Sequence, residues 1–94
     1  MITHIVLFKM KDRKNVEKAK AVLMGMKGRI SQLRHIEAGI DVLHSERSYD
    51  LALVTKFDSI EELKAYQANP VHVDVSKYMV SVRESSITVD YESG

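Results

Sequence analysis

The chain has 94 residues, with 14 Lys and Arg against 13 Asp and Glu, so its formal net charge is +1. At this length it forms one domain, residues 1–94, with a modest core. The absence of Cys excludes disulfides, thiolate metal sites and Cys nucleophiles. Its unbroken apolar run at the N-terminus, Ile5 to Phe8, is too short for a signal peptide or a membrane span. We therefore expect a cytoplasmic protein that does not bind membranes.

The charge is unevenly distributed along the chain. Residues 9–34 hold nine bases and two acids, a net of +7, whereas residues 35–94 hold five bases and eleven acids, a net of −6. The basic block fits either an anionic partner, such as a nucleic acid, or a solvated helix face that is offset by acids elsewhere. Because no Trp and few Phe or Tyr are present as stacking platforms, we favour the solvated face and expect no nucleic-acid partner.

Residues 2–10 predict a strand with two apolar faces. Side chains alternate between the faces of a strand. One face carries Ile2, His4, Val6, Phe8 and Met10, and the other carries Thr3, Ile5, Leu7 and Lys9. Both faces of this strand therefore need a cover.

A helix is predicted after this strand, with Asn15 as its N-cap. Its apolar residues recur at intervals of three and four, as in an amphipathic helix. They are Val16, Ala19, Leu23, Met26, Ile30 and Leu33. Gly25 and Gly28 weaken the last turns, so we place the end of the helix between Gly28 and Ser31.

A hairpin is predicted next. Apolar residues alternate over residues 36–42 and again over residues 51–57, and the polar sequence Ser45 to Ser48 forms a turn between them. The second of these strands is apolar on both faces, like the first strand of the chain.

Two helices and a last strand complete the pattern. Asp58 or Ser59 caps a helix that ends before Pro70, because the residue before a proline avoids helical geometry. Residues 71–82 have helical spacing and predict a shorter helix. Residues 87–91 alternate as the final strand.

This order of elements is typical of an α+β, ferredoxin-like βαββαβ subunit with a four-stranded antiparallel sheet. Its helices cover only one face of the sheet, and apolar residues on the other face then need a partner. We therefore predict a homodimer in which two sheets close face to face into an α/β barrel.

Four stretches of the chain also carry a family resemblance. They are His4 to Lys9; Gly39 with Ser45 to Leu53; Phe57 to Ser59 with Leu63, Tyr66, Pro70 and His72; and Val89 to Tyr91. In order and spacing they resemble the stress-responsive A/B barrel family, the dimeric α/β barrel domains abbreviated Dabb. The resemblance spans essentially the whole chain, and it implies the same subunit and the same face-to-face dimer.

Members of this family differ in what they do. Its bacterial members mostly lack an assigned reaction, and its plant members include stress-induced oligomeric proteins. One plant branch is a polyketide cyclase, which closes a linear poly-β-ketoacyl thioester by intramolecular aldol condensation. There a Tyr and a His, six residues apart, serve the chemistry, and the resemblance places them at Tyr66 and His72, with a further histidine at His4. The family often has His-Pro-x-His where this chain has Asn69 to His72, so the first histidine of that motif is replaced.

The resemblance implies a catalytic set of Tyr66, His72 and His4. A neutral His72 imidazole is able to take a proton from a carbon next to a carbonyl, while the Tyr66 phenol donates to the enolate oxygen that forms. The competing interpretation is structural: His72 caps a helix, Tyr66 packs against the sheet, and His4 is a core or interface residue.

A ligand pocket is expected between the first helix and the sheet, lined by Val6, Leu23 and Met26. The resemblance places Val22, Leu23 and Met26 where the cyclase has large aromatics, which implies a different or smaller ligand. No cofactor is expected, and the four histidines lack the HxH or HExxH spacing of a metal site.

Three functions stay open at this point. The first is a stress-responsive homodimer that binds a small, partly apolar carbonyl compound and catalyses proton abstraction, as in cyclisation or isomerisation. The second is a structural or binding protein without catalysis, and the third is a cofactor-free monooxygenase.

Overall fold

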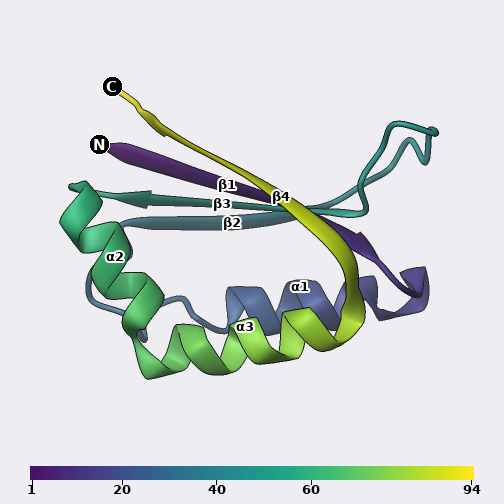
Figure 1. Cartoon of the computed structure of the whole chain (residues 1–94), viewed down its shortest axis with the longest axis horizontal. Coiled ribbons are helices and arrows are strands. Elements are labelled where there is room, and N and C mark those ends of the chain that lie inside the picture. Colours follow the sequence, from purple (N-terminus) through teal and green to yellow (C-terminus); the bar gives the residue numbers. More distant parts are fainter.

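The computed structural model describes all 94 residues. The elements are β1 (Ile2–Met10), the 3-10 turn η1 (Arg13–Asn15), α1 (Val16–Met24), β2 (His35–Ile40), β3 (Leu51–Phe57), α2 (Ile60–Ala68), α3 (Pro70–Val82) and β4 (Arg83–Glu92). This is the predicted ferredoxin-like arrangement, with its second helical segment divided between α2 and α3 (Figure 1). No helix combines the length and the apolarity that a bilayer crossing requires.

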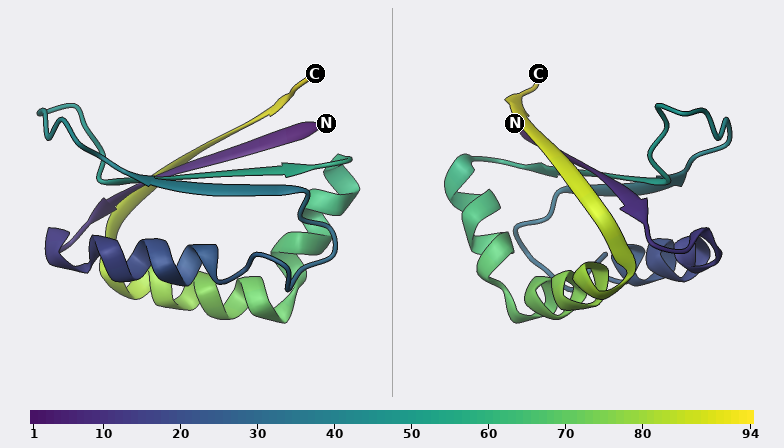
Figure 2. Two further views of the ribbon diagram at one scale, coloured as in Figure 1. Left: turned by 180° about the vertical axis from the view of Figure 1, so that it is seen from behind. Right: turned by 45° about the vertical axis from the view of Figure 1, so that its right-hand side comes forward.

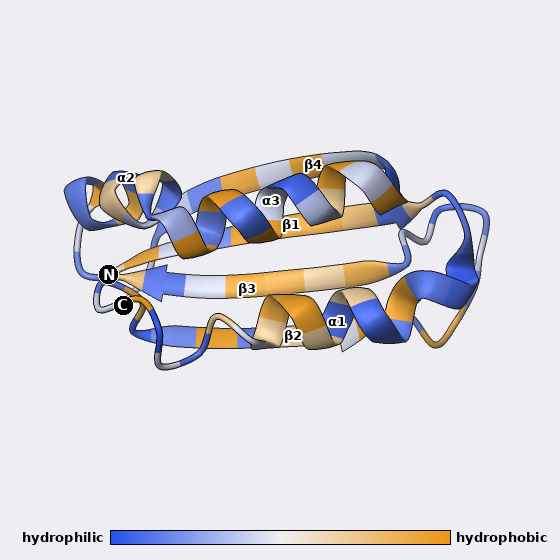
Figure 3. Ribbon diagram, turned by 90° about the horizontal axis from the view of Figure 1, so that it is seen from below, coloured by the Kyte–Doolittle hydropathy of each residue, from blue (hydrophilic) through white to orange (hydrophobic).

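The strands form one antiparallel sheet in the order β2-β3-β1-β4. In its centre, Val6 of β1 lies opposite Leu53 of β3 and Thr88 of β4. All helices lie on one side of the sheet, and the other side has no cover within the chain (Figures 1 and 2). Viewed from the helix side, α1 lies over the half of the sheet formed by β2 and β3, and α3 over the half formed by β1 and β4 (Figure 3).

The hydrophobic core fills the space between the sheet and the helices. Its largest fully buried apolar and aromatic side chains are Leu23, Met26, Leu51, Phe57 and Tyr66. Removing aliphatic and aromatic side chains of this size from water is the main favourable contribution to the free energy of folding. The predicted core therefore lies on this side of the sheet.

The opposite face of the sheet carries apolar side chains without cover. Ile87, Val89 and Tyr91 of β4 are 51%, 54% and 46% exposed. Val89 and Ile87 pair with Ile5 and Leu7 of β1, so their side chains form one continuous apolar surface. The second apolar face predicted from residues 2–10 is confirmed.

Helix α1 ends at Met24, earlier than the predicted end between Gly28 and Ser31. Gly28 has a φ of 78°, a conformation that glycine adopts without steric cost, and the chain turns there. Met26 and Ile30 are nevertheless 0% and 3% exposed, because the turns after the helix return them to the core. The apolar period therefore continues beyond the helix itself.

The helix starts differ in their caps. Asn15 occupies the N-cap position of α1 without a side-chain hydrogen bond, and Asp12 instead accepts from the Lys14 N–H at 2.9 Å in η1. At α2 the cap is Ser59, whose hydroxyl oxygen accepts from the Glu62 N–H at 3.2 Å.

Two strands differ from their predicted bounds. β2 ends at Ile40 rather than at residue 42, because the hairpin loop begins at Asp41, whose N–H donates to the Asp50 carbonyl at 2.9 Å. β4 starts directly after α3 at Arg83, before the predicted start at Ile87. Its first residues pair with the end of β1, where a register shift accommodates them.

Two bases of the 9–34 block pair with acids from the rest of the chain. Arg13 lies 3.5 Å from Asp50, and Arg34 lies 3.0 Å from Asp58. These pairs are exposed or partly exposed, so each contributes little to stability. They agree with a solvated face whose charge is offset by acids elsewhere in the fold.

Candidate functional site

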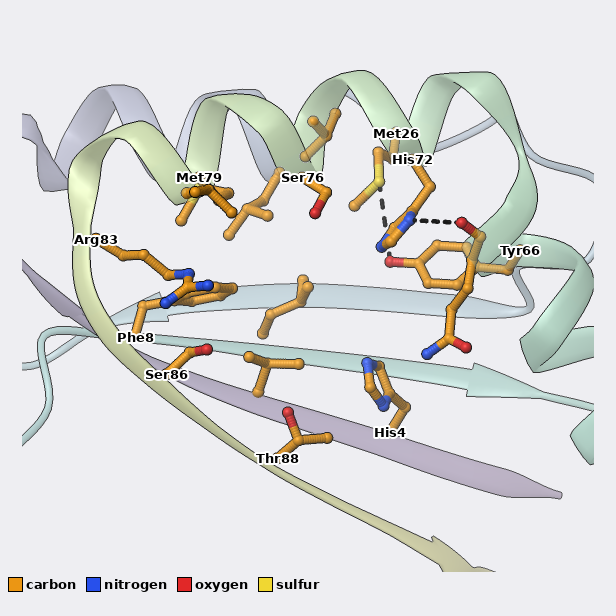
Figure 4. Close-up of a pocket in the computed structure, with 16 residues that line it drawn as sticks. His4, Phe8, Met26, Tyr66, His72, Ser76, Met79, Arg83, Ser86 and Thr88 are labelled. Atoms are coloured by element: carbon orange, nitrogen blue, oxygen red, sulfur yellow. Dashed lines mark hydrogen bonds between the residues drawn. The ribbon is translucent and has the colours of Figure 1, made fainter.

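A cavity of about 220 Å³ lies between the sheet and the helices, mostly under α3 (Figure 4). The sheet contributes residues of β1, β3 and β4 to its wall, and α2 and α3 supply most of the helical side. α1 and the turn after it contribute only Leu23 and Met26. The cavity therefore lies closer to α3 than the predicted pocket between the first helix and the sheet.

Every candidate site residue named from the sequence lines this one cavity. They are His4, Val6, Leu23, Met26, Tyr66 and His72. Val22, which the resemblance placed beside Leu23 and Met26, is not part of the wall. Residues 68 positions apart in the chain are thus brought together, and their roles in binding or catalysis remain predictions.

His72 is oriented by the junction between α2 and α3. Asn69 is extended there, with φ −65° and ψ 134°, and its side-chain oxygen accepts from the Val71 N–H at 2.9 Å. In the first turn of α3, His72 Nδ1 lies 3.1 Å from the Gln67 carbonyl oxygen. A carbonyl oxygen only accepts, so Nδ1 carries the proton and the neutral ring keeps its lone pair on Nε2.

The surroundings of His72 favour its neutral form. Burial lowers the pKa of His72 below 6.5, the hydrogen bond to Gln67 opposes this change, and the nearby His4 lowers the pKa further. At neutral pH the imidazole is therefore uncharged and able to accept a proton at Nε2.

Tyr66 is fully buried beside His72, at 0% exposure. Its ring centroid lies 4.7 Å from that of Phe57 and 4.5 Å from that of His72. Its hydroxyl donates only to the Met26 sulfur, at 3.9 Å, and a thioether is a weak acceptor. Because burial raises the pKa of Tyr66 far above its usual value, the phenol stays protonated as a hydrogen-bond donor.

His4 reaches the cavity from β1 and is held by Asp90 of β4. The two residues are directly opposite in the antiparallel register, and His4 Nδ1 hydrogen-bonds to Asp90 Oδ1. The register between β1 and β4 places the Asp90 carboxylate beside His4. The carboxylate accepts a hydrogen bond from the Nδ1–H group, so Nε2 of His4 is left for another partner.

The family follows from the sequence as well as from the fold. The family model of the stress responsive A/B barrel domain, Dabb, matches residues 2–93. The chain belongs to this family. Among curated proteins, no sequence matches this Dabb chain.

Solved structures with the same fold include proteins described as dimeric. A dimeric protein of unknown function from Bacteroides fragilis is 32% identical, with a TM-score of 0.86, over 98% of this chain and 95% of that chain. A dimeric ferredoxin-like protein from Thermobifida fusca is 25% identical, with a TM-score of 0.87, over 98% of this chain and 90% of that chain. The hydroxynitrile lyase of Passiflora edulis shares the fold, with 15% identity and a TM-score of 0.85 over 99% of this chain and 93% of that chain.

The other two histidines of this Dabb chain lie outside the cavity. His35 lies 3.3 Å from Glu37 on β2, and His44 lies 3.5 Å from Asp41 in the hairpin loop. The chain contains no cluster of three His, Asp or Glu side chains with the arrangement of a metal site.

Several polar residues of the cavity wall were not foreseen. Ser76 of α3 and Arg83, Ser86 and Thr88 of β4 line it together with the predicted residues. Arg83 and Ser86 precede the predicted start of the last strand at Ile87, so the sequence pattern did not place them on a face. Only the observed length of β4 brings them to the site.

Proposed function

We propose that this Dabb protein is a homodimer whose subunits each bind a small, partly apolar carbonyl compound and abstract a proton from the carbon next to the carbonyl group. The observation that carries this proposal is the orientation of His72. Its Nδ1 is bonded to the Gln67 carbonyl, which leaves Nε2 without a hydrogen bond. The ring centroid lies 4.5 Å from that of Tyr66, whose hydroxyl has only the Met26 sulfur as acceptor.

The proposed reaction starts with the substrate carbonyl oxygen accepting the Tyr66 hydroxyl hydrogen. His72 Nε2 takes a proton from the adjacent carbon, the C–H electron pair forms the enolate double bond, and the negative charge moves to the oxygen held by Tyr66. In an isomerisation, the protonated His72 returns the proton to another carbon. In an aldol cyclisation, the enolate carbon attacks a second carbonyl of the same molecule, and His72 protonates the new alkoxide.

His4 is the second proton-handling group of this proposal. Asp90 holds its Nδ1, so the ring has a fixed orientation, and Nε2 is available to accept a hydrogen bond from a hydroxyl group of the ligand. This arrangement suits a substrate with two oxygen functions. His4 also favours the neutral form of His72, the form required for a base.

The size of the cavity supports a small ligand. A cavity of about 150 Å³ is known to hold benzene, and this one measures about 220 Å³. It has room for one six-membered ring with a short substituent, or for a short chain. This fits the smaller ligand expected from Leu23 and Met26.

The proposed homodimer is supported by the uncovered apolar face. Ile87 and Val89 are each about half exposed on the side of the sheet away from the helices. The relatives from Bacteroides fragilis and Thermobifida fusca are described as dimeric. Joining two such faces removes both from water and leaves the cavities on the outer, helical sides.

The base assignment is tested by proton exchange on a neutral ketone. In D2O, the protein is expected to accelerate deuterium uptake next to the carbonyl of cyclohexanone, followed by proton NMR, and His72→Gln is expected to abolish the acceleration. His35→Gln is the matched control, because His35 is exposed and is not part of the cavity wall. Equal rates for wild type and His72→Gln would show that His72 is not the base.

The same experiment separates the alternative functions. Binding of cyclohexanone without exchange would support a binding protein without catalysis. Consumption of dissolved oxygen in the presence of an enolisable ligand would support the cofactor-free monooxygenase.

A further inference from the structure

Arg83 brings a positive charge into the wall of the cavity. It is the first residue of β4, directly after α3, and its backbone N–H donates to the Met79 carbonyl. Figure 4 shows its side chain extending into the cavity beside Phe8 and Ser86, at the end away from Tyr66 and His72. The two ends of the cavity therefore differ in chemistry.

The guanidinium of Arg83 has no acidic partner within the chain. The six ion pairs of the structure all involve other residues. Across the sheet, Arg83 pairs with Met10, and the nearby Ser86 pairs with Phe8. The β1 residues next to Arg83 are therefore apolar. A half-buried cation among apolar groups loses hydration, and an anion that enters the cavity compensates for that loss.

The chemistry of this end favours a carboxylate. A guanidinium presents a planar fork of N–H donors that matches the two oxygens of a carboxylate. Ser86 lies beside Arg83 on β4 and supplies a hydroxyl donor, and Ser76 supplies a second hydroxyl from the α3 side of the cavity (Figure 4). The carboxylate of Asp90, at the other end, is already bound to His4, so it does not compete for Arg83.

The distance between the two ends of the cavity limits the length of the ligand. On β1, His4 and Phe8 mark these ends, and four residues of strand span about 13 Å at about 3.3 Å per residue. The long side chain of Arg83 extends inward and shortens this gap. A chain with a carboxylate and a carbonyl a few methylene groups apart fits between Arg83 and the pair of Tyr66 and His72.

We infer that the cavity binds an oxo-carboxylic acid, with Arg83 binding its carboxylate and Tyr66 hydrogen-bonding its ketone oxygen. This inference rests on the proposed function for the ketone end, whereas the carboxylate end rests on Arg83 alone. The carbon next to the ketone then lies at His72.

The test compares levulinate, in which two methylene groups separate ketone and carboxylate, with its methyl ester, which lacks the charge. The homologues with one and two more methylene groups form the rest of the series. Binding is measured from shifts of the backbone amide signals in NMR titrations of the intact protein. Wild type is expected to bind the best acid about tenfold or more tightly than its ester, as for a charge-assisted pair in a partly buried site.

Substitution of Arg83 is expected to remove this preference. Arg83→Gln should weaken binding of the acid by about tenfold and leave the ester unchanged. Arg83→Lys, which keeps the charge without the fork, should lie in between. Arg47→Gln is the matched control, since Arg47 is exposed in the hairpin loop. This variant should bind both compounds like wild type.

The outcomes distinguish this inference from the proposed function. If acid and ester bind equally well to wild type, the carboxylate assignment is wrong, and the ketone site stands. If no acid of the series binds while cyclohexanone does, the assignment is likewise overturned. If neither acids, esters nor cyclohexanone bind, both the inference and the proposed function fail. The wild-type comparison of acid with ester decides the question even where Arg83→Gln does not fold.

Discussion

The neighbours of His72 fix the orientation of its ring and favour its uncharged form. Its hydrogen bond to Gln67 decides which nitrogen is free, and its burial beside Tyr66 favours the uncharged ring. The bond to the carbonyl favours the charged form and so opposes the burial, but burial is the larger influence on the pKa. The result is an uncharged imidazole at neutral pH, with the lone pair on Nε2.

The pKa of His72 predicts how stability depends on pH. Its pKa in the folded chain is lower than the value of about 6.5 expected in the unfolded chain. Below about pH 6.5 the unfolded chain therefore binds more protons, and the free energy of unfolding falls as the pH falls through the folded-state pKa. Urea denaturation between about pH 7 and pH 5 should show a steeper loss for wild type than for His72→Gln. Identical slopes for the two proteins would contradict a lowered pKa.

Tyr66→Phe should separate stability from chemistry. The Tyr66 hydroxyl has only the Met26 sulfur as acceptor, so its removal should cost less than about 1 kcal/mol of stability. The rate of ketone exchange should fall by about hundredfold, because the donor to the enolate oxygen is lost.

The control for this substitution is Tyr78→Phe. The Tyr78 hydroxyl is buried without a hydrogen-bond partner and is not part of the cavity wall. Exchange should stay at the wild-type rate in this variant. If Tyr66→Phe also keeps the wild-type rate, Tyr66 has a packing role only.

At the scale of elements, the junction of α2 and α3 connects the backbone to the site. Asn69 interrupts the helical run in an extended conformation, and Pro70 starts α3 without an N–H that would need a partner. The new helix begins at Pro70, two residues before His72, and brings its ring beside Tyr66. The proline predicted this break, but the direction of the new helix depended on its packing.

Asn69→Ala should therefore destabilise the protein by about 1 kcal/mol, the usual loss when an N-cap side chain is removed. Asn15→Ala is the matched control, because Asn15 occupies the N-cap position of α1 without a side-chain hydrogen bond. Its loss of stability should be smaller than that of Asn69→Ala in urea denaturation. Equal losses would show that the hydrogen bond from Val71 to Asn69 contributes nothing.

Periodicity predicted the elements better than it predicted their ends. Runs of apolar residues located β1 and β3, whose two apolar faces both need a cover. The end of α1 was misplaced, since Met26 and Ile30 stay buried after the helix has ended. Apolar spacing reports which side chains reach the core, and it does not report the backbone conformation that brings them there.

At the scale of the whole molecule, the fold followed from the order of elements, but the contacts of the site did not. The resemblance named His4, Tyr66 and His72, which the fold gathers around one cavity. The pairing of His4 with Asp90 joins residues 86 positions apart, and it depends on the register between β1 and β4. Register is a property of the assembled sheet, so neither this pair nor the position of Arg83 was visible in local patterns.

The uncovered face of the sheet predicts the effect of a charge on assembly. Val89→Lys places an ammonium group in the proposed dimer interface and should yield a monomer in sedimentation experiments at micromolar concentration. Val80→Lys is the matched control, because Val80 on α3 is 53% exposed and Val89 is 54% exposed. The control should stay dimeric. A monomeric wild type, or a dimeric Val89→Lys protein, would argue against dimerisation through this face.

The pairing of β1 with β4 also has a consequence for how the chain folds. β1 and β4 are neighbours in the sheet, although β1 is the first element of the chain and β4 is the last. Contacts at such separation close large loops, and proteins dominated by them fold slowly. Until β4 docks, the cavity lacks the wall that carries Arg83 and Ser86, and His4 lacks its carboxylate. A ligand bound by residues of both strands would accordingly slow the detachment of β4 more than the unfolding of the rest of the sheet.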